Sequence, residues 1–122
     1  MSSAKEVMGT TIFEEILAGK VPCKKVYEDE WTLAFHDVSP IAPVHILIIP
    51  KKKFVNVNDL VQPSDAQWAG HVLMAARHVA QLMGIEKTGY RLVMNNGSSA
   101  GQTVDYMHCH VIGGRDLHWP PG

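Results

Sequence analysis

Residues 44–49 are Val-His-Ile-Leu-Ile-Ile, a largely β-branched apolar run that Pro50 follows. β-branched side chains favour strands, and a short apolar run beside a proline indicates a buried strand. We therefore expect residues 44–49 to form the central strand of a sheet. His45 interrupts the run and places one polar side chain on a strand that is otherwise suited to burial.

Four further strands are expected around this one. Residues 24–29 and 32–36 are separated by an acidic turn and predict a hairpin. Residues 90–94 and 104–112 are apolar segments on either side of a loop rich in Gly, Ser and Asn, residues 95–101. Between the first three strands and the last two, the chain has room for one long helix.

Two helices are predicted from their start signals. Thr11 and Glu14 match a capping box that opens a short helix ending near Gly19. Residues 64–67, Ser-Asp-Ala-Gln, match a second capping box, and the helix that follows is expected to end at Gly84. The order helix, three strands, helix, two strands predicts an α+β fold, a five-stranded antiparallel sheet with its helices on one side.

The 122 residues are 46% hydrophobic and 19% charged, with a formal net charge of −1. These values predict one folded domain over residues 11–122, after a flexible N-terminus over residues 1–10. Because the net charge of the chain is close to zero, its charge does not indicate nucleic acid or a membrane as a partner. The lysines at 51–53 are interpreted as a solvated strand end. Two distant cysteines and no secretory signal indicate a reducing compartment, so we expect a cytoplasmic protein, and also a nuclear one if eukaryotic.

Alternation along the last predicted strand separates its side chains into two sets. Tyr106, His108 and His110 share one face, and the residues between them are apolar and share the other. Taken alone, the two histidines have three interpretations. They can be histidines with ordinary polar partners, part of a zinc site completed by His36 or His45, or catalytic groups.

The loop before this strand favours the third interpretation. Residues 96–103 are Asn-Gly-Ser-Ser-Ala-Gly-Gln-Thr, which offer unhindered backbone amides and side-chain donors that can bind an anion. A neutral imidazole beside such a loop can attack phosphorus while the donors neutralise oxygen charge. The sequence thus predicts phosphate chemistry, with no metal and no cofactor.

Five segments resemble the histidine triad (HIT) family, in its branch of histidine triad nucleotide-binding proteins, and the resemblance runs in register from Thr11 to the C-terminus. The segments are residues 35–40 (FHDVSP), 43–52 (PVHILIIPKK), 101–104 (GQTV), 108–115 (HCHVIGGR) and 118–122 (HWPPG). The resemblance implies a homodimer with sheets joined across the interface. It also implies hydrolysis of purine nucleoside phosphoramidates and aminoacyl adenylates through a nucleotidyl-histidine intermediate, with nucleoside monophosphates as ligands.

The resemblance also assigns roles by position. His108 matches the nucleophile, His110 the histidine that contacts phosphate, and His45 an additional site histidine. The residues matched around the phosphate and leaving group are Asn95, Gln102 and Thr103, and Gly101 and Val104 are matched as further nucleotide-binding residues. Asp37 matches the carboxylate that holds the ribose. The residues that match the base pocket are Ile12, Phe13, Ile16, Phe35, His36 and Val38. Trp119 matches a tail residue that reaches the partner subunit's site.

One position departs from the family pattern. The pattern has three alternating histidines, and Tyr106 stands in place of the first. In the family, the backbone carbonyl at this position orients the nucleophile, so Tyr106 can keep that contact, donate its hydroxyl elsewhere or crowd the site. The chain is therefore expected to be a hydrolase, with a nucleotide-binding adaptor of weak or lost catalysis as the alternative. Asn96, where the family often has an acidic residue, is expected to shift leaving-group preference away from cationic amines.

Overall fold

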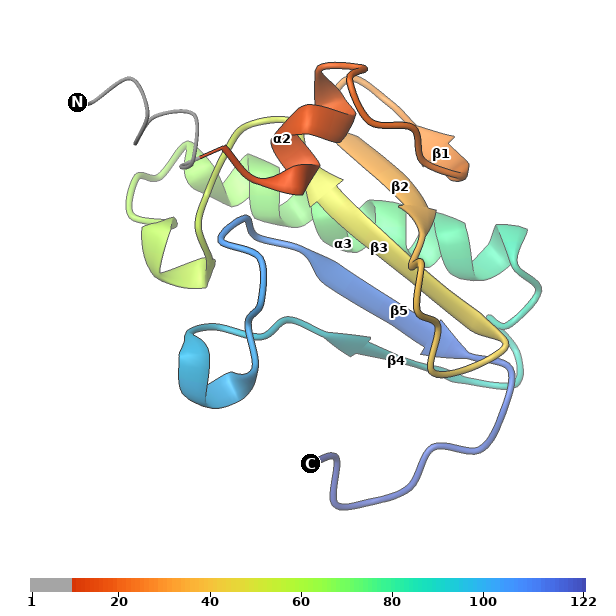
Figure 1. Ribbon diagram of the computed structural model, residues 1–122. Helices are drawn as coiled ribbons and strands as arrows, with labels where there is room; N and C mark the ends of the chain where they lie inside the picture. Colours follow the sequence, from red (N-terminus) through yellow and green to blue (C-terminus); the bar gives the residue numbers. More distant parts are fainter. Residues whose placement is uncertain (1–9) are drawn as a thin grey trace.

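Five strands form one antiparallel sheet in the computed structural model, which describes residues 10–122 (Figure 1). The strand order is β1-β2-β3-β5-β4, so β3 is central, as predicted. The elements, in chain order, are α2 (Ile12–Leu17), β1 (Lys25–Glu28), β2 (Thr32–His36), β3 (Val44–Pro50), α3 (Asp65–Leu82), β4 (Tyr90–Val93) and β5 (Cys109–Gly113), with 3-10 turns at Val57–Asp59 and Ser98–Ala100. The predicted α+β fold is confirmed, whereas the prediction of a flexible N-terminus falls almost entirely outside the described residues.

The two faces of the sheet are covered by different helices. On one face, strand side chains such as Ile46 and Val111 pack against α3 through Val72 and Val79. On the opposite face, Phe13 of α2 packs with Leu33, Phe35, Leu47, Ile49 and Tyr106. The expectation that both helices lie on one side is wrong. The short α2 covers only one end of its face, and the rest of that face stays open beside β5 and β4 (Figure 1).

The helix starts differ from one another. At α2 the capping box is present, since Thr11 Oγ1 accepts from the Glu14 amide and Glu14 Oε1 accepts from the Thr11 amide. At α3 the predicted capping box is wrong, because Ser64 makes no side-chain capping bond. The Asp65 carboxylate instead accepts from the amides of Val61 and Gln62, and so holds the turn that leads into the helix.

Strand β5 is shorter than the predicted span of residues 104–112. The last pair of its ladder with β3 is Ile48 with Cys109, and Pro50 beyond it has no N–H to continue the ladder. The Met107 amide donates to the Phe54 carbonyl instead, and the Tyr106 amide turns back to Val104. His108 thus lies in the extended segment just before β5, while His110 lies within it.

The lysines that follow β3 are neutralised by neighbouring carboxylates. The ion pairs are Lys51 with Glu28 at 2.8 Å, Lys52 with Asp65 at 3.6 Å and Lys53 with Glu14 at 3.0 Å. This run is therefore not a free cationic patch. Among the described residues, no helix is both long and apolar enough to cross a bilayer.

Candidate active site

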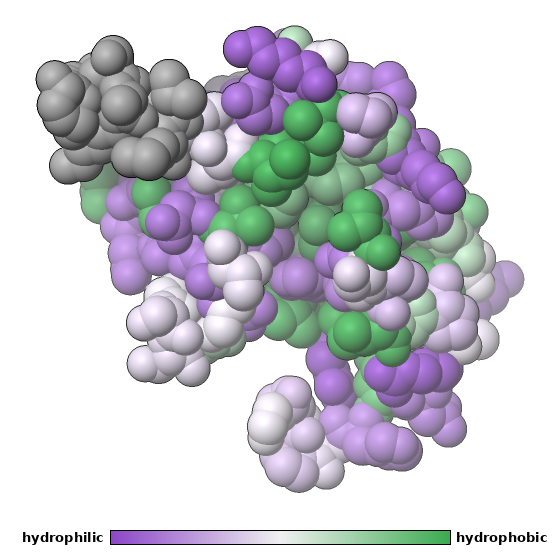
Figure 2. All heavy atoms as spheres, viewed as in Figure 1, coloured by the Kyte–Doolittle hydropathy of each residue, from purple (hydrophilic) through white to green (hydrophobic). Residues whose placement is uncertain are grey.

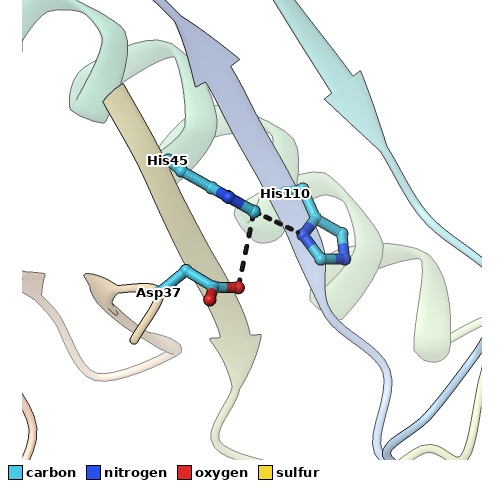
Figure 3. Close-up of side chains that lie close together, drawn as sticks. All are labelled: Asp37, His45 and His110. Carbon is cyan, nitrogen blue, oxygen red and sulfur yellow. Dashed lines mark hydrogen bonds and ion pairs between the residues drawn. The ribbon is translucent and has the colours of Figure 1, made fainter. Parts of the chain in front are cut away.

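Three histidines meet on the face of the sheet opposite α3. His45 comes from β3 and His110 from β5, and both lie beside Asp37, which follows β2 (Figure 3). His108 precedes β5 on the same face, with its ring centroid 5.0 Å from that of His110. Strand alternation explains this placement, because Ile46 and Val111, their chain neighbours, point to α3.

His108 is held in one tautomer by the main chain. Its Nδ1 lies 2.6 Å from the carbonyl oxygen of Tyr106, so Nδ1 carries the proton and donates it there. Nε2 therefore keeps its lone pair. Burial lowers the pKa of His108 below its ordinary value, and the ring packs edge-on against Phe13 at 5.0 Å. The imidazole is neutral at pH 7 and presents a nucleophilic nitrogen.

His45 links Asp37 to His110. The Ile41 amide donates to His45 Nδ1 at 3.1 Å, so the proton of the neutral ring is on Nε2. That Nε2 lies 2.9 Å from His110 Nδ1 and 3.4 Å from Asp37 Oδ2. His110 Nδ1 therefore accepts the hydrogen bond from His45 Nε2, and the proton of the neutral His110 ring is on its Nε2.

His110 Nε2 is the one buried side-chain nitrogen or oxygen of the described residues that has no hydrogen-bond partner. Burial lowers the pKa of His110 to about 4, with smaller contributions from the nearby His108 and His45. A buried N–H donor without a partner is unfavourable unless a ligand supplies an acceptor. The site is thus prepared to donate a hydrogen bond to an oxygen of a ligand.

A zinc site is disfavoured by the same proton positions. The ligand atoms of Asp37, His45 and His110 lie within 4.8 Å of one another, close enough to surround one cation. A metal-bound histidine donates its other N–H to an acceptor. The second nitrogen of His45 accepts from the Ile41 amide instead, so metal binding at Nε2 would set two donors against each other. His36, the other candidate ligand, is paired with Ile46 and shares its α3 face.

Tyr106 leaves the site unobstructed. Its side chain is fully buried among Phe13, Phe35 and Leu47, and its hydroxyl donates to the Pro50 carbonyl at 2.5 Å. Two of the possibilities that the sequence leaves open are therefore met together. The Tyr106 hydroxyl donates to Pro50, and the Tyr106 carbonyl still accepts from His108 Nδ1.

Gln102 is fully engaged within the protein. Its Oε1 accepts from Asn56 Nδ2 and the Gly97 amide, and its Nε2 donates to the carbonyls of Val55 and Val104. The bonds to Val55 and Asn56 tie the 97–103 loop to the segment after β3, and the other two brace the loop itself. Both ends of the Gln102 side chain thus have partners within the chain, whereas Thr103 is exposed and Asn95 lines a cavity described below.

The predicted base-pocket residues separate into three groups. Phe13, Ile16 and Phe35 belong to one apolar cluster with Tyr106, against which Val104 also packs. Ile12 and Val38 are exposed, at 47% and 98% of their surface. His36 is directed to the other face of the sheet, so its predicted place in the pocket is wrong for the side chain. Trp119 is 81% exposed in this single chain.

A cavity of about 490 Å³ opens beside His45 and His110. Asn95, Arg91 and Arg115 line it, together with the C-terminal tail; in Figure 2 this face is hollowed between the tail and the 97–103 loop. Neither arginine was predicted from the sequence as a site residue. The pairing of β4 with β5 puts Arg91 opposite Ile112, on the face of His110, but this register is not readable from a four-residue strand.

Comparisons with known proteins agree with this arrangement. The family model described as the HIT domain matches residues 18–117. An uncharacterized HIT-like protein of Synechocystis is 47% identical over 112 residues, covering 92% of this chain and 96% of that protein. A HIT family hydrolase of Legionella pneumophila has a TM-score of 0.88 at 43% identity, covering 93% of this chain and all of the other.

A histidine triad nucleotide-binding protein of Candida albicans is more distant, with a TM-score of 0.77 and 29% identity over 91% of this chain and 83% of that one. The five strands, the paired histidines and four of the five sequence motifs fall within residues 18–117. This chain belongs to the HIT domain family.

Proposed function

We propose that this protein hydrolyses purine nucleoside phosphoramidates and aminoacyl adenylates, as in the nucleotide-binding branch of the family. The observation that carries the proposal is the fixed tautomer of His108. Nδ1–H donates a hydrogen bond to the Tyr106 carbonyl at 2.6 Å, and burial favours the neutral ring, so Nε2 is available as a nucleophile. The names of two similar proteins, one a hydrolase and one nucleotide-binding, support the coarser statement of a hydrolase that binds nucleotides.

In the first step, the His108 Nε2 lone pair forms a bond to phosphorus, and the bond from phosphorus to the leaving group breaks. An amine leaves with a proton from the solvent or the site, or a carboxylate leaves as the anion. The imidazole is then cationic, and its Nδ1–H remains bonded to the Tyr106 carbonyl. The Nε2–H of His110, which has no partner in the protein, supplies a donor to a phosphate oxygen.

In the second step, water attacks phosphorus and the bond to Nε2 breaks. Nucleoside monophosphate leaves and neutral His108 is restored, with no metal or cofactor required by the atom balance. Ile12, Ile16 and Val38 supply an apolar surface for a purine, with Phe13 and Phe35 buried in the core, and Asp37 supplies carboxylate oxygens for ribose hydroxyls. The Oδ1 of Asp37 already accepts from the Ser39 amide, which fixes the carboxylate.

The experiment is turnover of adenosine 5′-phosphoramidate by the wild type and by His108→Ala. We expect release of adenosine monophosphate by the wild type and a loss of at least about a thousandfold in kcat in the variant, since it has no nucleophile. When the reaction is stopped after a short time and without acid, a nucleotidyl adduct should be preserved, and mass spectrometry should locate it at residue 108. Equal turnover by the two proteins would refute the assignment, and nucleotide binding without turnover would instead support the adaptor alternative.

The proposed partners are purine nucleotides and a second copy of this chain. Nucleic acid and membranes are not proposed as partners, because the one lysine run is ion-paired. A cytoplasmic location remains our proposal, and the relatives described above give no support to a nuclear one.

A further inference from the structure

The cavity beside His45 and His110 is cationic. Its lining includes Arg91 and Arg115 and contains no Asp or Glu. Neither arginine has a carboxylate within 4.0 Å among residues 10–122, although each lysine at 51–53 has one. Two guanidinium groups without a carboxylate partner, on the wall of a cavity, favour a ligand with negative charge.

The two arginines differ in how many donors remain available. Arg115 uses its Nε and both terminal nitrogens on the carbonyls of Ile41 and Asp116. Arg91 uses one N–H, from Nη2 to the His118 carbonyl at 2.8 Å, and a guanidinium carries five. Three bonds hold Arg115 in place and leave it two N–H donors, whereas Arg91 keeps four and can bind a ligand in bidentate fashion.

The register of the sheet places Arg91 near His110, the histidine proposed to contact phosphate. Val93 is directly opposite His110, and Arg91 is two residues earlier on the same strand, hence on the same face. Such diagonal neighbours lie about 7–8 Å apart. This separation suits a group attached a few bonds from a phosphorus atom that contacts His110.

We propose that this cavity receives the leaving group and that Arg91 selects leaving amines that carry a carboxylate. The inference rests on the proposed hydrolase function and names its preferred substrates as nucleoside phosphoramidates of amino acids with a free carboxylate. Asn95, which also lines the cavity, adds an uncharged polar group. The expectation that Asn96 disfavours cationic amines has the same direction, although it comes from a different residue.

The test compares two adenosine 5′-phosphoramidates that differ in one group, the β-alanine conjugate and its carboxamide. For the wild type we expect kcat/KM to be about tenfold or more higher for the carboxylate, since hydrogen bonds to a charged group contribute about that factor. Arg91→Gln should reduce this ratio to near one, and Arg91→Lys should leave an intermediate ratio. Arg77→Gln, at an exposed position on α3, is the matched control and should keep the wild-type ratio.

The ratio separates recognition from folding, because a merely structural defect lowers kcat/KM for the two substrates by the same factor. Equal kcat/KM for the two substrates in the wild type would overturn the inference and leave the hydrolase function intact. Calorimetry with the two adenosine 5′-carbamates, which cannot be hydrolysed, measures the same preference without turnover. A preference for the carboxylate carbamate without any hydrolysis would overturn only the proposed function. If neither carbamate binds, the proposed function and the inference are both overturned.

Discussion

Tyr106 shows that a side-chain pattern and a chemical role can be carried by different atoms of one residue. The role that matters to His108 belongs to the backbone carbonyl, which any residue supplies. The side chain is free to serve the core, where the aromatic ring fits among Phe13, Phe35 and Leu47. A substitution that breaks the family pattern therefore leaves the geometry of the nucleophile intact.

Tyr106→Phe tests this division. Removing the hydroxyl leaves the buried Pro50 carbonyl without its donor, which should lower the free energy of unfolding by about 1–3 kcal/mol. Phosphoramidate turnover should stay within a few-fold of wild type, because the His108 contact is unchanged. Urea denaturation and steady-state kinetics measure the two effects. A large loss of turnover with unchanged stability would mean that the hydroxyl acts in catalysis.

His110 gives the protein a specific dependence on pH. Its pKa is about 4 in the folded chain and about 6.5 in an unfolded one, so the unfolded state binds more protons between these values. The free energy of unfolding should therefore fall as the pH drops from 6.5 to 4 and level off below. His110→Asn should reduce this slope, measured by denaturation at a series of pH values. An unchanged slope would assign the effect to other groups.

At the scale of elements, Gln102 joins two segments that are far apart in sequence. Its amide bridges the 97–103 loop to Val55 and Asn56, so the backbone amides of the loop are positioned before any ligand binds. Gln102→Ala should lower the free energy of unfolding by about 1–3 kcal/mol and raise KM for the phosphoramidate more than it lowers kcat.

Hydrogen exchange provides the direct measure of this bridge. The Gly97 amide, which donates to Gln102 at 2.8 Å, should lose protection in Gln102→Ala and keep it in Gln81→Ala, an exposed position on α3. Unchanged protection of Gly97 in Gln102→Ala would show that the loop holds itself without the bridge.

The elements themselves were largely predictable, because each is encoded locally. The β-branched run at 44–49 predicts β3, and the Thr11–Glu14 box predicts the start of α2. Errors arise where a distant partner decides. Strand β5 starts late because Pro50 of another strand cannot continue the ladder, and α2 lies on the open face because Phe13 fits the cluster there. Neither cause is visible within the segment concerned.

At the scale of the whole molecule, the site is assembled from segments that only the fold brings together. Resemblance located His45, His108, His110 and Asp37, and the structure places the four on one face. It could not locate Arg91, whose position depends on the register between β4 and β5. It also could not show that Gln102 is already bonded within the chain, since its partners include residues more than 40 positions away.

The two edges of the sheet differ in how well they resist pairing with another chain. Strand β1 has a register irregularity between Lys25 and Tyr27 and begins with a lysine, and both features discourage an added strand. Strand β4 pairs regularly with β5 and leaves Leu92 38% exposed at the edge. If the predicted homodimer joins its sheets, β4 is therefore the edge at which they meet.

Leu92→Asp tests this interface. A charge on the β4 edge would be buried against the second copy, so the variant should be monomeric at concentrations at which the wild type is a dimer. Sedimentation equilibrium measures the mass of each species. Val61→Asp, at a position 71% exposed and outside the sheet, is the control and should remain dimeric. A monomeric wild type would contradict the dimer itself, whereas a dimeric Leu92→Asp would place the interface away from β4.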